Sequence, residues 1–215
     1  MTYLQIVNSV LRKLRQDEVT SVSDSDYSKL IGDLVNIAKD DVEQAFKWNV
    51  LRDTISINTV SGTFRYVLTG AGTQSLIIDV WNDTDDFMLR KASVYELNSN
   101  FTHDTITGTP TKYGINGSDS NGDLQVDLYP IPDAVYNIDF NVVLKQADLS
   151  ADADVALVPG NLIVLAAWSL AISERGEDGG TGSSNIGALY QSALSEAIAI
   201  DASNMHTSET TWCAY

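Results

Sequence analysis

The stretch LIVLAAWSLAI, residues 162–172, is the feature that most limits how this chain can fold. It holds eleven residues, and Ser169 is the only polar one. A helix that is apolar almost all the way round is buried, because any outward face would leave apolar surface in water. The stretch is also too short to cross a bilayer, which takes about 20 residues. We therefore expect a helix at the centre of a helical bundle.

Apolar residues three and four positions apart indicate helices in four segments. Thr2 and Gln5 match a capping box at the start of the first one. In the second, the polar residues, among them Lys39 and Glu43, fall on the side opposite the apolar residues. Pro159 suits the first turn of the third helix, which should end at a glycine. The four expected helices cover residues 2–15, about 23–48, 159–174 and about 184–203.

Between the second and third helices the apolar period changes to two, which is typical of strands. Residues 53–60 and 64–68 alternate on either side of a short turn, and we expect them to pair as a hairpin. A second hairpin is expected across the dipeptide Asn121-Gly122, which favours a tight turn. Residues 135–144 alternate in the same way and are a further expected strand.

Together these elements predict an α+β fold. We expect a four-helix bundle, residues 1–51 and 157–204, with an antiparallel β domain, residues 52–156, inserted between its second and third helices. The third helix is the most apolar, so it should have the most neighbours. Residues 205–215 show no periodicity and are expected to form an extended C-terminal segment.

The charge of the chain limits the functions that fit it. The net charge is −16, from 29 acidic and 13 basic residues. Such a surface repels nucleic acid, so we expect no sequence-specific DNA binding, although DNA can pass along an acidic wall without sticking. The single cysteine, Cys213, builds no intramolecular disulfide, so a reducing compartment is expected. The N-terminal sequence does not match a signal peptide.

The sequence contains no known catalytic motif. It lacks the patterns GxSxG, HExxH, Walker A and GxGxxG. Its two histidines, His103 and His206, fall in an expected loop and in the C-terminal segment. We therefore expect no enzyme activity, no catalytic residues and no cofactor.

A calcium loop is suggested by Asp119, Asn121 and Asp123, which alternate as cation ligands often do. The EF-hand pattern also needs a glycine at its sixth position and a glutamate at its twelfth. Counted from Asp119, those positions hold Leu124 and Pro130. A hairpin turn is the better interpretation, and we expect no metal site.

The C-terminal segment ends in large aromatic residues after a polar stretch. Trp212, Cys213 and Tyr215 are the last of these side chains. One interpretation is a frayed end, or Trp212 folded back on the bundle. The other is an aromatic anchor for a groove on another protein, because buried aromatic residues dominate the energy of interfaces. The residues alone leave both open.

Five stretches spread along the chain carry a likeness that extends over nearly its whole length: MTYLQIVNSVLRKL, LVNIAKDDVEQAFKWNVLR running into DTISI, GTPTKYGI, LQVDLYPIPDAVYNIDF and VPGNLIVLAAWSLAISERGEDGG. In these stretches the chain resembles the head-to-tail adaptor proteins of tailed bacteriophages. It is similar in particular to the tail tubular protein A type of short-tailed phages. The part from Met205 onward is the least family-like.

The resemblance implies a structural virion protein at the head-tail junction, assembled in the host cytoplasm. Such adaptors form a homo-oligomeric ring, usually of twelve subunits, that couples the portal protein to the tail and surrounds a channel for DNA. The C-terminal segment of related connectors docks on the portal. Here that role falls on residues 205–215, with Met205, His206, Trp212, Cys213 and Tyr215 as the candidate contacts.

Further partners follow from the same resemblance. The β domain would face outward or toward the tail, where a nozzle protein or a tail fibre attaches, and no membrane is involved. One alternative is another tail component, such as a nozzle or baseplate-like module. A second, less favoured alternative is a hydrolase whose carboxylates come from scattered positions without a motif.

Overall fold

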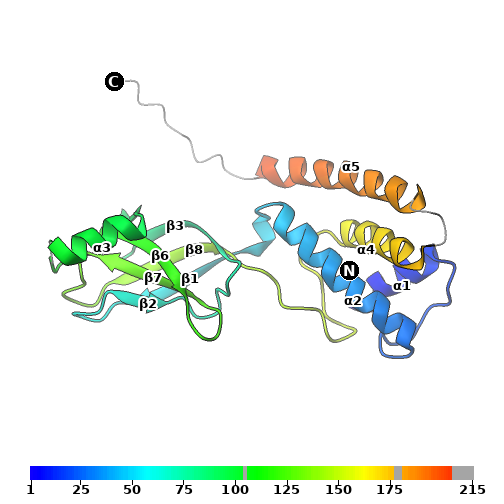
Figure 1. The fold of residues 1–215 in the computed structure, drawn as a ribbon, viewed down its shortest axis with the longest axis horizontal. Helices are drawn as coiled ribbons and strands as arrows, with labels where there is room; N and C mark the ends of the chain where they lie inside the picture. The colour runs from blue at the N-terminus through cyan, green and yellow to red at the C-terminus, as the bar shows by residue number, and fades with distance from the viewer. Residues whose placement is uncertain (104–105, 177–180, 205–215) are drawn as a thin grey trace, which may run out of the picture. The chain divides into compact units, whose positions relative to one another are not determined.

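The computed structural model describes residues 1–103, 106–176 and 181–204. Within them the fold is α+β, with five α-helices and two four-stranded sheets, so the predicted class is confirmed. The chain divides into two compact units, and Figure 1 shows the elements of each. Residues 1–51 and the described residues from Gln146 to Asn204 form the helical unit, and the described residues of Arg52–Lys145 form the strand unit.

The helical unit is built around α4, which packs against α1, α2 and α5, while α1 also packs against α2. Six residues of α4 are buried, including Leu162, Ile163 and Ala167. The most apolar helix therefore has the most helical neighbours, as the sequence predicted. The elements of this unit are α1 (Tyr3–Lys13), α2 (Asp26–Ala45), the 3-10 turn η1 (Asn49–Leu51), α4 (Gly160–Arg175) and α5 (Thr181–Asn204).

The starts and ends of these helices follow local chemistry. Thr2 Oγ1 accepts a hydrogen bond from the Gln5 N–H at 3.3 Å, and Gln5 Oε1 accepts one from the Thr2 N–H at 3.0 Å. The predicted capping box is therefore confirmed. Pro159 is the N-cap of α4, and Gly176 ends it with φ +63°, a left-handed conformation that glycine adopts without strain.

Helix α2 ends at Ala45, earlier than the predicted end at Trp48. Phe46 takes an extended backbone conformation there. The buried Trp48 indole turns back on the helix, and its Nε1 donates to the Val42 carbonyl oxygen at 2.7 Å. The two aromatic rings meet edge to face with centroids 5.5 Å apart, a contact worth about 0.5–1.5 kcal/mol. This packing ends the helix and leads the chain into η1.

The strand unit contains two sheets with a short helix beside one of them. The first sheet has the order β1-β8-β3-β4 and the second the order β2-β7-β6-β5. Helix α3 packs against β6 and β7. The elements are β1 (Arg52–Asn58), β2 (Arg65–Val67), β3 (Leu76–Asn82), β4 (Phe87–Met88), β5 (Arg90–Lys91), α3 (Val94–His103), β6 (Lys112–Ser118), β7 (Leu124–Tyr129) and β8 (Asn137–Val143).

The predicted pairing of residues 53–60 with 64–68 is wrong, because β1 and β2 belong to different sheets. β1 pairs with β8 instead, so that Ile57 lies opposite Ile138. β2 pairs with β7, where Arg65 Nε and Asp127 Oδ1 are 2.7 Å apart. Alternation shows that a segment is a strand, but it carries no information about which strand lies beside it.

The second predicted hairpin is confirmed, since β6 and β7 pair antiparallel across the 119–123 turn. The core of the strand unit lies among apolar side chains from both sheets. Tyr113 and Phe140 come from different sheets and meet edge to face with ring centroids 6.2 Å apart. Buried Asp127 is held by Arg65 and by Asn116 Nδ2 at 2.7 Å, which satisfies its charge inside the unit.

Candidate assembly surfaces

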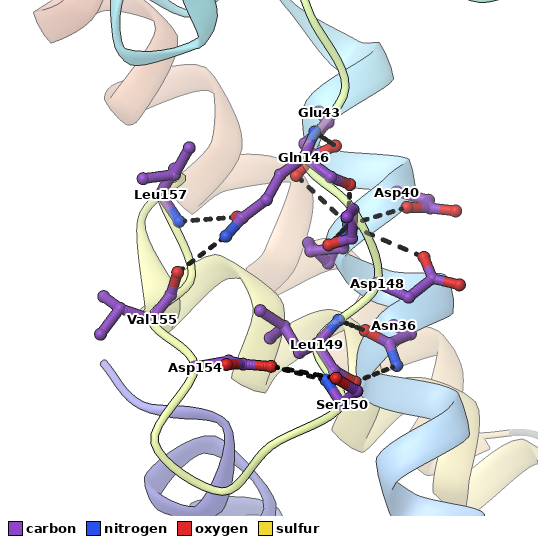
Figure 2. Close-up of polar contacts among 12 residues, drawn as sticks. Asn36, Asp40, Glu43, Gln146, Asp148, Leu149, Ser150, Asp154, Val155 and Leu157 are labelled. Atoms are coloured by element: carbon purple, nitrogen blue, oxygen red, sulfur yellow. Dashed lines mark hydrogen bonds and ion pairs between the residues drawn. The ribbon is translucent and has the colours of Figure 1, made fainter. Parts of the chain in front are cut away.

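Residues 146–158, here called the return segment, bring the chain from the strand unit back to α4. We expected residues 146–156 in the β domain, but they belong to the helical unit when the chain is divided into compact units. Figure 2 shows the polar contacts by which this segment lies along α2. These contacts position the start of α4 and the N-terminus of the chain.

The centre of this network is Lys39 on α2, whose side chain is fully buried. Its Nζ donates to the backbone carbonyl oxygens of Gln146 at 2.6 Å and Ala147 at 3.2 Å. Three carboxylates lie around the same ammonium group, those of Asp40 at 3.4 Å, Glu43 at 3.6 Å and Asp148 at 3.9 Å. A buried ammonium group is tolerated only with such partners.

Glu43 is buried beside Lys39 and also contacts the return segment. Its Oε2 accepts a hydrogen bond from the Gln146 N–H at 3.2 Å. Burial raises the pKa of the Glu43 carboxyl above its ordinary value, while the Lys39 charge and the Gln146 N–H oppose that rise. The polar side of α2, which the sequence placed opposite the apolar residues, is therefore partly buried at these two positions.

Two amide side chains fix the rest of the return segment (Figure 2). Asn36 Nδ2 donates to the Leu149 carbonyl oxygen at 3.0 Å, and the Leu149 N–H donates back to Asn36 Oδ1 at 2.9 Å. Gln146 Nε2 donates to the Val155 carbonyl oxygen at 2.8 Å, and Gln146 Oε1 accepts from the Leu157 N–H at 3.0 Å. Each amide thus pairs with backbone groups as a neighbouring strand would, which holds an irregular segment in one conformation.

The return segment also holds the first turn of α1. The Tyr3 N–H donates to the Asp154 carbonyl oxygen at 2.7 Å, and the Leu4 N–H donates to the Asp152 carbonyl oxygen at 3.2 Å. These are two of the N–H groups that a helix start leaves without a partner inside the helix. The N-terminus, α2 and the start of α4 are therefore joined through one irregular stretch.

A second contact fixes the C-terminal end of α5. The Asn49 N–H donates to Asp201 Oδ2 at 2.9 Å, and Asn49 Nδ2 donates to the Asp201 carbonyl oxygen at 3.1 Å. Asn49 begins η1, and Asp201 lies in the last turn of α5. The residue that leads out of the helical unit is thereby bound to the end of the last helix.

The predicted docking residues follow directly after this helix. Met205, His206, Trp212, Cys213 and Tyr215 all lie outside the described residues, which end at Asn204. The structure therefore brings none of them into a described site, and their role stays a prediction. The described part of the chain ends with the last turn of α5, directly before Met205.

A groove of about 560 Å³ lies between α1 and α4. The side chains that line it are partly apolar and partly basic. At its edge, Lys13 Nζ lies 4.6 Å from the centroid of the Trp168 ring, in a cation–π contact. Arg12 forms an exposed ion pair with Glu18 at 2.9 Å. The lining residues are Met1, Ser9, Arg12, Lys13, Asn161, Val164 and Leu165.

The suggested calcium loop at residues 119–123 forms a hydrogen-bonded turn. Asp119 Oδ1 accepts hydrogen bonds from the Asn121 and Asp123 N–H groups at 2.8 and 2.9 Å, which is the chemistry of a turn. Across the described residues, no three His, Cys, Asp or Glu side chains are grouped so that they could hold a metal ion. None of the helices in the described ranges has the length and apolarity that a membrane crossing requires.

Sequence reasoning missed the return segment and the groove. The groove needs two helices from opposite ends of the chain, and no local pattern reports it. The return segment did leave a signal, since Asn36, Lys39 and Glu43 are spaced three and four apart and so line one stripe of α2. A polar stripe of this kind can face a backbone segment as well as water.

A comparison with models of known protein families gives a match. The family model described as SU10 adaptor protein matches residues 1–211, nearly the full chain. No match to a curated protein was found. The family match supports the resemblance to phage adaptor proteins. It does not show the narrower similarity to the tail tubular protein A type, which stays a prediction. The chain belongs to the SU10 adaptor protein family and is a structural adaptor protein of bacteriophages.

Proposed function

We propose that this protein is a head-to-tail adaptor that forms a ring between the portal and the tail. The observation that carries the proposal is the adaptor family match over residues 1–211. The ring surrounds a central channel through which DNA passes without sequence-specific binding. The net charge of −16 suits such a wall, because like charge keeps a polyanion from adhering.

Docking on the portal is assigned to residues 205–215. The Asn49–Asp201 contact supports this role, because it fixes the end of the helix from which the segment continues. A segment that starts at a fixed point loses less freedom when it binds than one that starts on a loose helix end. Trp212 and Tyr215 are the expected anchors, since aromatic residues dominate interface energies.

The two units are given different tasks in this proposal. The helical unit acts as a four-helix bundle whose sides contact neighbouring copies in the ring. The strand unit, inserted in sequence between α2 and α4, presents a surface to the next tail protein, such as a nozzle protein or a fibre. Cross-strand neighbours Trp81 and Met88 are exposed on its first sheet and are suited to such a contact.

Sedimentation of the purified chain with and without portal tests the proposal. We expect the chain alone to be a monomer or a mixture of small species, and to join the portal as a complete ring when portal is added. A chain that stays monomeric and does not sediment with portal at any ratio would contradict the proposal.

A further inference from the structure

Helix α5 has an unusually uncharged outward face. The 24 residues of this helix include only two charged side chains, Glu196 and Asp201, and Asp201 is bound to Asn49. Leu189 and Ile200 are 59% and 67% exposed, although both are large and apolar. They lie seven residues before and four residues after Glu196, so the three side chains share one stripe of the helix.

The α1–α4 groove offers the complementary chemistry. Its apolar part includes Met1, which is 45% exposed, and Leu165, which is half-buried. Lys13 stands at its edge and is exposed, and it forms no ion pair with any residue in the described ranges. An acidic side chain on an incoming apolar helix would therefore meet a basic group that contacts the Trp168 ring and forms no ion pair with the described residues.

One copy of the chain cannot fill its own groove with this stripe. Helix α5 packs on α4 through the side that carries the buried Ile186 and Leu194. The exposed stripe with Glu196 lies about a quarter turn round the helix from that side. The stripe and the groove are thus two different surfaces of the same unit. Contact between two different surfaces of identical subunits is head-to-tail, and it repeats from copy to copy until a ring closes.

We propose that the Leu189–Glu196–Ile200 stripe of one copy packs into the α1–α4 groove of the next copy, with Glu196 paired to Lys13. This rests on the ring of the proposed function and names the contact that forms it. Ile200 lies four residues, about 6 Å, from Glu196 along the helix, and the groove of about 560 Å³ has room for its side chain. The opposite charges fix the register of the stripe in the groove, which is what charges at interfaces do best.

Charge exchange tests the pairing on the full chain bound to portal. Glu196→Lys and Lys13→Glu each place like charges in every contact, and Lys13→Gln removes the attraction without reversing it. We expect each reversal to prevent ring closure. We also expect each to raise, by at least about tenfold, the concentration of this chain at which half of its sites on the portal are filled. The chain that carries both reversals restores an opposite pair in every contact, so the ring should return.

Matched controls are Glu174→Lys and Lys29→Glu, which make the same charge changes at exposed positions of the helical unit outside the stripe and the groove lining. Both should form rings like the unchanged chain. The number of subunits on each portal is measured by sedimentation velocity, and thermal unfolding checks that every variant is folded.

The possible results test the Glu196–Lys13 contact separately from the proposed adaptor function. If both single reversals close rings as the controls do, or if the double reversal fails to restore a ring that each single reversal loses, the Glu196–Lys13 contact is rejected while the adaptor role stands. If the unchanged chain forms no ring on portal, the proposed function itself fails.

Discussion

Lys39 Nζ lies 2.6 Å from the carbonyl oxygen of Gln146, and this hydrogen bond joins the middle of α2 to the first residue of the return segment. The lysine is fully buried, so its charge depends on the backbone oxygens and carboxylates around it. The path of the chain back into the helical unit is therefore set by a polar group. Apolar packing then begins again at α4.

Replacing this lysine should destabilise the helical unit strongly. Lys39→Met fits the space of the stem but leaves the buried Glu43 carboxylate and two carbonyl oxygens without their donor. Removing one partner of a buried ion pair costs about 3–5 kcal/mol. The free energy of unfolding of the helical unit in urea, followed by Trp48 and Trp168 fluorescence in a chain with Trp81 and Trp212 replaced by Phe, measures the loss.

The matched control is Lys29→Met on the same helix. Lys29 pairs with Asp26 at the surface, where such a pair contributes about 0–1 kcal/mol. A Lys39→Met protein as stable as the Lys29→Met protein would show that the buried network does not hold the return segment.

Glu43 should make the helical unit less stable as the pH rises. Burial raises the pKa of its carboxyl in the folded state above the ordinary value of 4.5. A group with a raised folded-state pKa stabilises the fold below its unfolded pKa, and that stability is lost as the pH rises through the folded pKa. Glu43→Gln keeps an acceptor for the Gln146 N–H and does not titrate.

The measurement for Glu43 is the difference in unfolding free energy between the Gln variant and the unchanged chain. This difference should move in favour of the variant as the pH increases above 4.5. Asp154→Asn is the contrasting control, because backbone N–H groups of Ala151 and Ser150 lower the pKa of that carboxyl. Its contribution is lost as the pH falls below the ordinary value of 3.8. A flat Glu43 comparison would rule out the raised pKa.

Asp201→Ala should loosen the end of α5. The variant loses the hydrogen bond from the Asn49 N–H to the carboxylate, which is worth about 1–2 kcal/mol. Amide hydrogen exchange in the last turn of α5 should then be roughly tenfold faster, with little change in α4. Ser195→Ala, at an exposed position on the same helix, is the control. Equal exchange in the two variants would contradict an anchoring role for Asp201.

Deleting residues 205–215 should leave the fold intact and abolish portal binding. Within the full chain, Trp212→Ala together with Tyr215→Ala should weaken binding by at least about 30-fold, because an aromatic hot spot is worth about 2 kcal/mol or more. Thr207→Ala with Ser208→Ala changes polar residues of the same segment and should have little effect. Full portal binding by the deleted chain would exclude the segment from docking.

Features that depend on neighbouring residues could be predicted from the sequence. The capping box of Thr2 and Gln5 and the end of α4 at Gly176 each depend on chemistry within one turn. The central position of α4 followed from the composition of residues 162–172, because an apolar helix must be covered on all sides.

Features that depend on distant partners could not be predicted in this way. Ile57 carries the alternation of a strand, but only the folded chain shows that Ile138 lies opposite it. Lys39 looks like a surface residue until the return segment, more than a hundred positions later, covers it. The groove between α1 and α4 likewise needs the two ends of the chain to meet.

The most direct measurement is electron microscopy of portal complexes formed with the full chain and, in parallel, with the chain that ends at Asn204. With the full chain we predict a closed ring of this protein on one face of the portal, twelve copies around an open channel. With the shortened chain we predict bare portal. Portal particles that carry no ring with the full chain would contradict it.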